Sequence, residues 1–344
     1  MTTTTATEVV LPGVVEPNGL LVRTRELPAP GPGEVVLRMD ATGVGFAEQQ
    51  MRRGTYYRQP PFPFVPGCDL VGTVTATGDG VDPAMAGRRY AAVTKTGSWS
   101  SHLLLDAADL VPVPAGLDPA AAEAVAVNGV TAWQMIYRTA RVRPGSTIVV
   151  LGANGGVGSL LVQLARYAGS TVIGTASARH HDALRKLGAI PVDYRDPEMY
   201  QRIRGLAPDG VDAVFDHVGG DAITRSWLLL RRGGTLVSYG TAATKDEAGN
   251  SPLPFLKLFV RLSAWNALPN GKSAHFYNFW AGRCRRSGFR RRLDEDLTRV
   301  LRLVADGVLT PRIAARIPLA EAASALELAE SRTVFGKVVL VPRA

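Results

Sequence analysis

The chain has 344 residues, 46% of them hydrophobic and 20% charged, which is the composition of a globular protein of about two domains. The net charge of +9 comes without any nucleic-acid-binding signature, so it suits an anionic cofactor or an acyl thioester better than nucleic acid. No apolar run reaches the roughly 20 residues of a transmembrane segment, and the first residues lack the features of a secretion signal. Two cysteines cannot form a disulfide framework. We therefore expect a cytoplasmic protein.

Residues 1 to about 125 are predicted to form a compact β domain. Short apolar or β-branched runs alternate there with turns rich in proline and glycine, at the spacing of a small β-barrel. The expected strands are residues 35–39, 70–75, 90–93 and 101–105.

From residue 126 to about 309 the pattern changes to strands that alternate with helices, which predicts a parallel, doubly wound sheet of Rossmann type. The expected strands are residues 146–151, 171–175, 190–193, 211–215 and 235–239. Two further expected strands, 313–317 and 337–341, predict that residues from about 310 to 344 return to the β domain and complete it.

Residues 241–288 are harder to interpret. The stretch is long, irregular in pattern and rich in aromatic residues, and we expect it to line a substrate pocket or to form a subunit contact. An arginine run follows within 283–292. Such a run is usually a solvated face, but it also suits an acidic carrier protein, the phosphates of a thioester or a membrane surface.

A glycine-rich turn joins the first expected strand of the parallel sheet to the next helix. Without Cβ atoms, the main chain of such a turn can approach the phosphates of a dinucleotide, and the helix N-terminus adds unpaired N–H donors. The residues predicted to bind the cofactor here are Gly152, Asn154, Gly155, Gly156, Val157 and Gly158. His217, Val218, Tyr239 and Gly240 follow the carboxyl ends of later strands, where such sheets bind ligands.

Six segments, spread over almost the whole chain, resemble the medium-chain dehydrogenase/reductases, in particular their zinc-independent quinone oxidoreductase-like (zeta-crystallin-like) branch. They are RGTY (53–56), PFVPG (63–67), NGVTA (128–132), GANGGVG (152–158), FDHVGG (215–220) and GKVVL (336–340). The resemblance implies a GroES-like β-barrel domain beside the Rossmann domain, an active site in the cleft between them, and a homodimer.

The resemblance also implies roles for single residues. Asn128, Thr131 and Lys337 match cofactor contacts of the family. Without the resemblance, Asn128 and Thr131 would be interpreted as a helix cap, and Lys337 could equally be a solvated strand residue. Tyr56 matches a tyrosine that faces the nicotinamide, so it is the candidate proton or hydrogen-bond donor; the alternative is that it only packs there. Tyr57 is a neighbouring candidate.

No metal is expected. Zinc-dependent relatives bind a catalytic zinc with three side chains, which the resemblance places at Gly45, Cys68 and near Asn128. Only Cys68 of these could bind zinc, and one thiolate cannot replace three protein ligands.

NADPH is the expected cofactor. No carboxylate follows the second strand of the sheet, where NAD sites place one, and Ser177 and Arg179 stand there instead as donors to a 2′-phosphate. Tyr194 matches a tyrosine that the family uses at this point, while His181 replaces the usual lysine.

The expected reaction is hydride transfer to a quinone or to an activated double bond, such as that of an enone or enoyl thioester. Alcohol oxidation is not expected, because no metal is available to polarise an alcohol. By the resemblance, many relatives carry an asparagine where this chain has Gly45. Its absence, together with the aromatic and arginine-rich region after Thr241, keeps an alternative open: a nucleotide-binding interaction protein whose catalysis is secondary or lost. A third hypothesis is a biosynthetic reductase that acts on a carrier-bound or natural-product intermediate.

Overall fold

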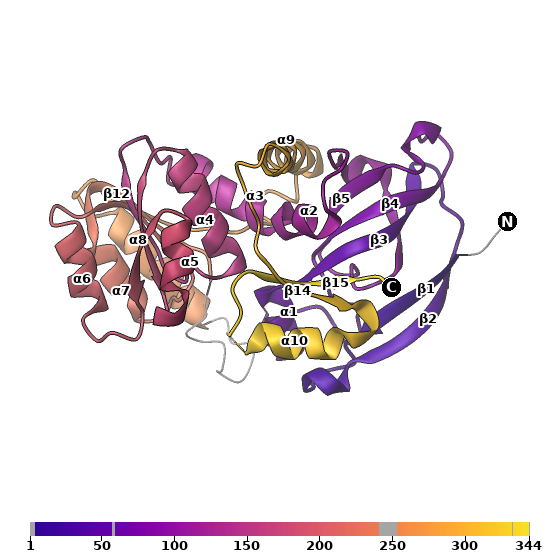
Figure 1. The fold of residues 1–344 in the computed structure, drawn as a ribbon, viewed down its shortest axis with the longest axis horizontal. Helices are drawn as coiled ribbons and strands as arrows, with labels where there is room; N and C mark the ends of the chain where they lie inside the picture. Colours follow the sequence, from indigo (N-terminus) through magenta and orange to yellow (C-terminus); the bar gives the residue numbers. More distant parts are fainter. Residues whose placement is uncertain (1–3, 57–58, 241–252, 332, 344) are drawn as a thin grey trace. The chain divides into compact units, whose positions relative to one another are not determined.

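The computed structural model describes residues 4–56, 59–240, 253–331 and 333–343 (Figure 1). These residues divide into two compact units: unit 1 comprises Met1–Val130 and Gly282–Ala344, and unit 2 comprises Thr131–Ala281. Among the described residues, no helix combines the length and the apolar character needed to cross a bilayer.

Unit 2 is built on a six-stranded parallel sheet in the order β10-β9-β8-β11-β12-β13, with helices packed around it (Figure 1). This order is that of a Rossmann fold, and it confirms the predicted doubly wound sheet. The strands are β8 (Thr147–Val150), β9 (Thr171–Ala176), β10 (Ala189–Asp193), β11 (Val211–Asp216), β12 (Leu230–Ser238) and β13 (Ser273–Phe276). The helices are α4 (Gly156–Tyr167), α5 (His181–Lys186), α6 (Met199–Leu206), α7 (Ala222–Leu228) and α8 (Leu253–Asn266).

The strands β8, β9 and β11 of this sheet are largely buried. β8 and β11 are the central pair, and apolar side chains from both pack into a core with Trp227 and Leu262. The stretch interpreted as irregular contains α8 and the edge strand β13, while residues 241–252 lie outside the described residues. β13 was missed because its four residues include no β-branched side chain.

Unit 1 contains a seven-stranded sheet in the order β14-β15-β3-β4-β5-β7, with β6 paired to β3, and the two-stranded sheet β1-β2. The strands are β1 (Thr4–Val10), β2 (Leu21–Leu27), β3 (Glu34–Val44), β4 (Asp69–Thr77), β5 (Arg89–Val93), β6 (His102–Asp106), β7 (Leu110–Pro112), β14 (Ile313–Pro318) and β15 (Lys337–Val341). Its helices are α1 (Phe46–Arg52), α2 (Pro119–Ala126), α9 (Arg286–Ala305) and α10 (Ala322–Glu330). Helix α3 (Asn128–Trp133) lies at the division of the units and continues as a π-helical turn, Gln134–Thr139.

The C-terminal residues complete the sheet of unit 1. β15 pairs with β3, and α10 contributes Leu326 to the same core as Trp99 and Leu37. The sequence placed the return of the chain at about residue 310, whereas unit 1 already resumes at Gly282. The reason is α9, whose Arg286 and Arg290 bind Asp106 and Asp109 beside β7.

Candidate functional site

The glycine turn after β8 has the geometry that a phosphate-binding loop needs. Gly152 has a φ of +65°, which favours glycine. A Cβ on Gly158 would lie 2.2 Å from the carbonyl oxygen of Gly152, so only glycine lets α4 start this close to the turn. Gly155 precedes α4 with an extended φ of −75°, and a Cβ there would meet its nearest atom at 3.4 Å. The N–H groups of the first turn of α4 have no intrahelical acceptor and are free to bind an anion.

Gly158 is required for close backbone packing, whereas Gly155 is predicted to leave room for a phosphate to approach. This difference can be tested. Gly158→Ala should lower both the melting temperature and the affinity for NADPH, because the methyl group collides with backbone. Gly155→Ala should leave the melting temperature within about 2 °C and still weaken NADPH binding by about tenfold or more, because its methyl group would enter the space that the predicted pyrophosphate site requires. Thermal unfolding and cofactor titration of both variants measure this; equal melting temperatures of the two would contradict the assignment.

The loops after β11 and β12 lie against the glycine turn. Nδ1 of His217 is 3.1 Å from the carbonyl oxygen of Leu151, and the ring fills the space beside Gly152. The His217 and Tyr239 rings are 6.0 Å apart between centroids, and Gly240 packs against the His217 backbone. The structure thus brings together residues that the sequence predicted separately, at the sheet edge where strand order reverses.

Asp216 shapes this edge and was not among the predicted site residues. Its carboxylate is fully buried and accepts hydrogen bonds from the N–H groups of Val218 and Gly219 and from the Ser226 hydroxyl. Tyr239 donates its backbone N–H to the Asp216 carbonyl. Burial, together with the nearby Asp216 charge, raises the pKa of Tyr239 above its ordinary value, so its phenol stays protonated well into alkaline pH. The signal in the sequence was an aspartate between an apolar strand and two glycines, a pattern typical of a side chain that caps its own turn.

Polar residues gather at the carboxyl ends of β9 and β10. Ser177 is buried and accepts a hydrogen bond from Nε of the exposed Arg179 at 3.3 Å. Nε2 of His181 lies 3.3 Å from the carbonyl oxygen of Ala176, which also accepts the backbone N–H of Tyr194. Arg195 lies 5.5 Å from the centroid of the Tyr194 ring and adds a second guanidinium, which was not among the predicted site residues.

In unit 1, Tyr56 follows the end of α1 and packs, half-buried, on the cluster of Leu11, Met51 and Cys68. Tyr57 lies outside the described residues. Both alternatives for Tyr56, a donor or a packing residue, stay predictions.

The position of Cys68 bears on the metal question. Burial raises the pKa of the Cys68 thiol well above its usual range, and the neighbouring Glu48 raises it further. Glu48 is itself buried, its pKa is raised by that burial, and it accepts the N–H of Gly45 at 2.8 Å. Within the described ranges, no three His, Cys, Asp or Glu side chains are grouped so as to hold a metal.

Lys337 lies in the core of unit 1. Its ammonium donates to Asp69 Oδ2 at 3.0 Å and to Glu123 Oε1 at 2.7 Å, and its side chain is 5% exposed. The interpretation as a solvated strand residue is therefore wrong, and the predicted cofactor contact stays a prediction. Asn128 begins α3 half-buried and Thr131 is buried one turn later, and their cofactor roles also stay predictions.

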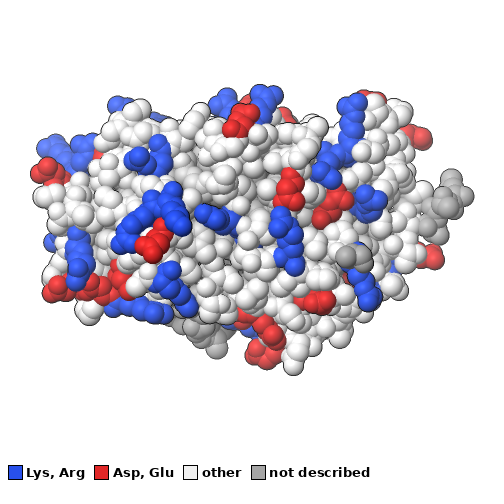
Figure 2. Space-filling view, viewed as in Figure 1, with Lys and Arg blue, Asp and Glu red and all other residues white. Residues whose placement is uncertain are grey.

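The arginine run is in part an ion-paired surface. Besides the pairs of Arg286 and Arg290 with Asp106 and Asp109, Arg292 lies over the Phe289 ring. The guanidinium of Arg290 holds the pKa of Asp106 below its usual value. On the face drawn in Figure 2, basic and acidic side chains are interspersed rather than gathered in one field.

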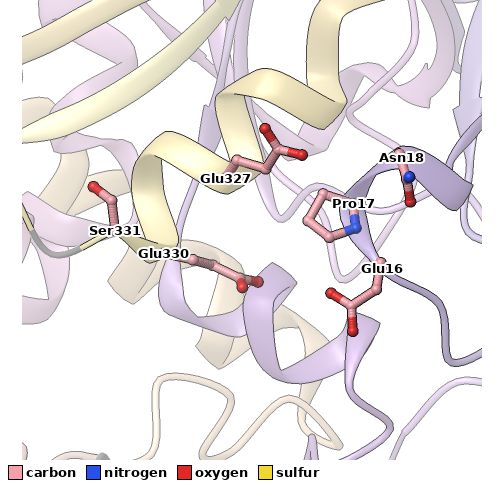
Figure 3. Close-up of a pocket in the computed structure, with 6 residues that line it drawn as sticks. All are labelled: Glu16, Pro17, Asn18, Glu327, Glu330 and Ser331. Atoms are coloured by element: carbon pink, nitrogen blue, oxygen red, sulfur yellow. The ribbon is translucent and has the colours of Figure 1, made fainter.

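A hollow of about 400 Å³ lies in unit 1 between the 3₁₀ turn Pro17–Gly19 and α10 (Figure 3). It includes none of the predicted site residues. Its lining residues are Glu16, Pro17, Asn18, Glu327, Glu330 and Ser331.

Two family models match the chain. One, described as an alcohol dehydrogenase GroES-like domain, matches residues 31–115, and the other, described as a zinc-binding dehydrogenase, matches residues 187–340. The second description refers to zinc, although only Cys68 of the three inferred ligand positions carries a zinc-binding side chain here.

Curated relatives and solved structures agree with these models. The chain is 32% identical to the synaptic vesicle membrane protein VAT-1 homolog of Rattus norvegicus, over 92% of this chain and 78% of that protein. It is 31% identical to a 2-haloacrylate reductase of a Burkholderia species, over 92% and 93%.

A crystal structure of Escherichia coli quinone oxidoreductase complexed with NADPH superposes with a TM-score of 0.82, at 26% identity over 98% of this chain and all of that one. The chain belongs to the medium-chain dehydrogenase/reductase superfamily of oxidoreductases, and within it to the zinc-independent quinone oxidoreductase-like branch.

Proposed function

We propose that this chain is an NADPH-dependent reductase of an activated carbon–carbon double bond or a quinone. The observation that carries the proposal is the glycine turn, where a Cβ on Gly158 would strike the Gly152 backbone and where α4 presents its N-terminus. This cradle fits the pyrophosphate of a dinucleotide. A quinone oxidoreductase bound to NADPH and a 2-haloacrylate reductase, whose named substrate has an activated double bond, support the reaction class.

The preference for NADPH rests on the ends of β9 and β10. Ser177 and Arg179 offer donors where NAD sites carry an acidic residue, and Arg195 adds positive charge beside Tyr194. A 2′-phosphate carries negative charge and three acceptor oxygens, so it suits this set of donors.

The Arg179→Ala variant should separate the two cofactors. A hydrogen bond to a charged group contributes about 1.5–3 kcal/mol, so NADPH affinity should fall about tenfold or more, while NADH affinity should stay within about twofold. Arg185→Ala is the control, because Arg185 lies on the adjoining helix α5, where its exposed guanidinium pairs with the exposed Asp182. Fluorescence titration with both cofactors measures the effect; an equal loss for NADH would contradict the role.

In this proposal, different residues of the chain carry out different parts of the reduction. NADPH, when bound, supplies the hydride. The turn before α4 would hold the diphosphate and so position the cofactor, while Tyr56 would donate a hydrogen bond to the acceptor oxygen on which charge develops, or deliver the proton. A phenol can do either at neutral pH without a metal.

NADPH consumption with a small panel of enones, quinones and enoyl thioesters tests this function. Steady turnover with any acceptor supports the reductase, and turnover confined to thioesters selects the carrier-bound or biosynthetic substrate. NADPH binding without turnover across the panel would favour the competing hypothesis, a nucleotide-binding interaction protein.

We also propose that the protein is a homodimer and lies in the cytoplasm. Leu256, Phe259 and Val260 are exposed on one face of α8, and exposed apolar side chains at this spacing favour a subunit contact.

A further inference from the structure

The end of α1 is held by a carboxylate from the far end of the chain. Glu330, the last residue of α10, accepts Nε of Arg52 at 3.0 Å on one oxygen and Nη2 of Arg52 at 2.9 Å on the other. Nη2 of Arg53 reaches the second oxygen at 2.7 Å. One carboxylate therefore binds two consecutive guanidinium groups, one of them in a bidentate arrangement that fixes direction as well as distance.

This contact is shielded from water. The side chains of Arg52 and Glu330 are 6% and 13% exposed, and Nη1 of Arg52 donates to the carbonyl oxygen of Val15 at 2.6 Å. Glu327 projects from the same helix and lines the same hollow as Glu330, but it is exposed (Figure 3). Exposed ion pairs contribute little, whereas a buried bidentate pair strongly constrains both partners.

The arginines lead directly into the turn that carries Tyr56. The N–H of Gly54 donates to Met51 at 3.1 Å and that of Thr55 to Gln50 at 3.0 Å, so the turn is hydrogen-bonded back onto α1. Gly54 has a φ of +68°, which lets the chain reverse sharply there. Because the turn is fastened to α1, a shift of Arg52 and Arg53 is transmitted to Tyr56 within four residues.

We propose that Glu330 is a positioning residue for Tyr56: it holds the end of α1 so that the phenol stays in its productive place. This inference rests on the proposed function of Tyr56. Glu330 would act only through Arg52, Arg53 and the turn, without contacting cofactor or substrate.

The test compares Glu330→Ala and the milder Glu330→Gln with Glu327→Gln, which removes the same charge from the same helix. A misplacement of about 1 Å can reduce turnover by up to about 100-fold, so kcat should fall about tenfold to 100-fold in Glu330→Ala and less in Glu330→Gln. KM for NADPH should change by less than about twofold, because the glycine turn that binds it is untouched. Glu327→Gln should keep the activity of the parent protein.

Two further measurements distinguish positioning from a purely structural role. In a Tyr56→Phe background, Glu330→Ala should lower kcat no further, because the residue through which it acts is already lost. Hydrogen exchange should accelerate in α1 and the following turn in Glu330→Ala but not in Glu327→Gln. A lower melting temperature with unchanged kcat, or an equal loss of kcat in both backgrounds, would overturn the inference.

The experiment also separates this inference from the proposed function. If Tyr56→Phe alone leaves kcat unchanged, the role of Tyr56 fails, and the exchange data then decide whether Glu330 holds the turn at all. Unchanged hydrogen exchange in both Glu330 variants would also overturn the inference that Glu330 holds the turn.

Discussion

Lys337→Met should lower the free energy of unfolding by about 3–5 kcal/mol, because it leaves Asp69 and Glu123 buried without their counter-ion. Whole domains are stable by only about 5–15 kcal/mol, so this is a large fraction of the total. Methionine preserves the shape of the lysine stem, so the loss reports charge rather than volume. Denaturant unfolding measures it, and Lys186→Met, at an exposed lysine, should change stability by less than about 0.5 kcal/mol.

The stability loss in Lys337→Met should also depend on pH. Burial of Lys337 would by itself lower its pKa, but Asp69 and Glu123 raise it above the ordinary value, so in the parent protein its contribution is lost only at alkaline pH. Burial raises the pKa of Glu123 well above its usual range, and this shift should grow when the ammonium is removed. The native variant then holds more protons than the unfolded chain, so its stability falls as pH rises. The deficit relative to the parent protein should be smaller near pH 5 than near pH 8, and a deficit that shrinks with rising pH would contradict the ion cluster.

Tyr56→Phe should reduce kcat by about 10²–10⁴-fold, the usual contribution of a positioned acid or hydrogen-bond donor. The ring keeps its packing on Leu11, Met51 and Cys68, so stability and the affinity for NADPH should stay close to those of the parent protein. Steady-state kinetics with an acceptor from the panel measure the loss. Tyr167→Phe, at an exposed tyrosine of α4, provides the matched control.

A loss smaller than about twofold in Tyr56→Phe would leave Tyr56 only the packing role that the sequence also allowed. A large loss accompanied by a lower melting temperature would point to the same conclusion, since removal of one hydroxyl group should not disturb the apolar cluster.

The parts of the site that the sequence predicted are local in the chain. The roles of Gly152 and Gly158 follow from a strand, a turn and a helix that are contiguous, so the pattern alone specifies them. Ser177, Arg179 and Tyr194 follow strands whose pairing is set by the fold, and their gathering could be anticipated once a parallel sheet was expected.

The contacts that the sequence did not predict join distant residues. Asp69 and Lys337 are 268 positions apart, and Arg52 and Glu330 are 278 positions apart, so no local pattern marks either pair. β2 was missed for a different reason: all but the last of its residues are exposed, and it therefore lacks the apolar run of a buried strand. The assignment of α9 to unit 1 likewise depends on its contacts with α2 and β7, far earlier in the chain.

The split arrangement of unit 1 has a consequence for biosynthesis. Because β15 and α10 supply part of its core, the first 130 residues leave the ribosome without the partners that complete their sheet. Unit 2 is continuous in the chain, so it can finish folding while unit 1 waits. Until Lys337 has been synthesised, Asp69 and Glu123 have no ammonium to neutralise them, so residues 1–130 should become native only after unit 2 has folded.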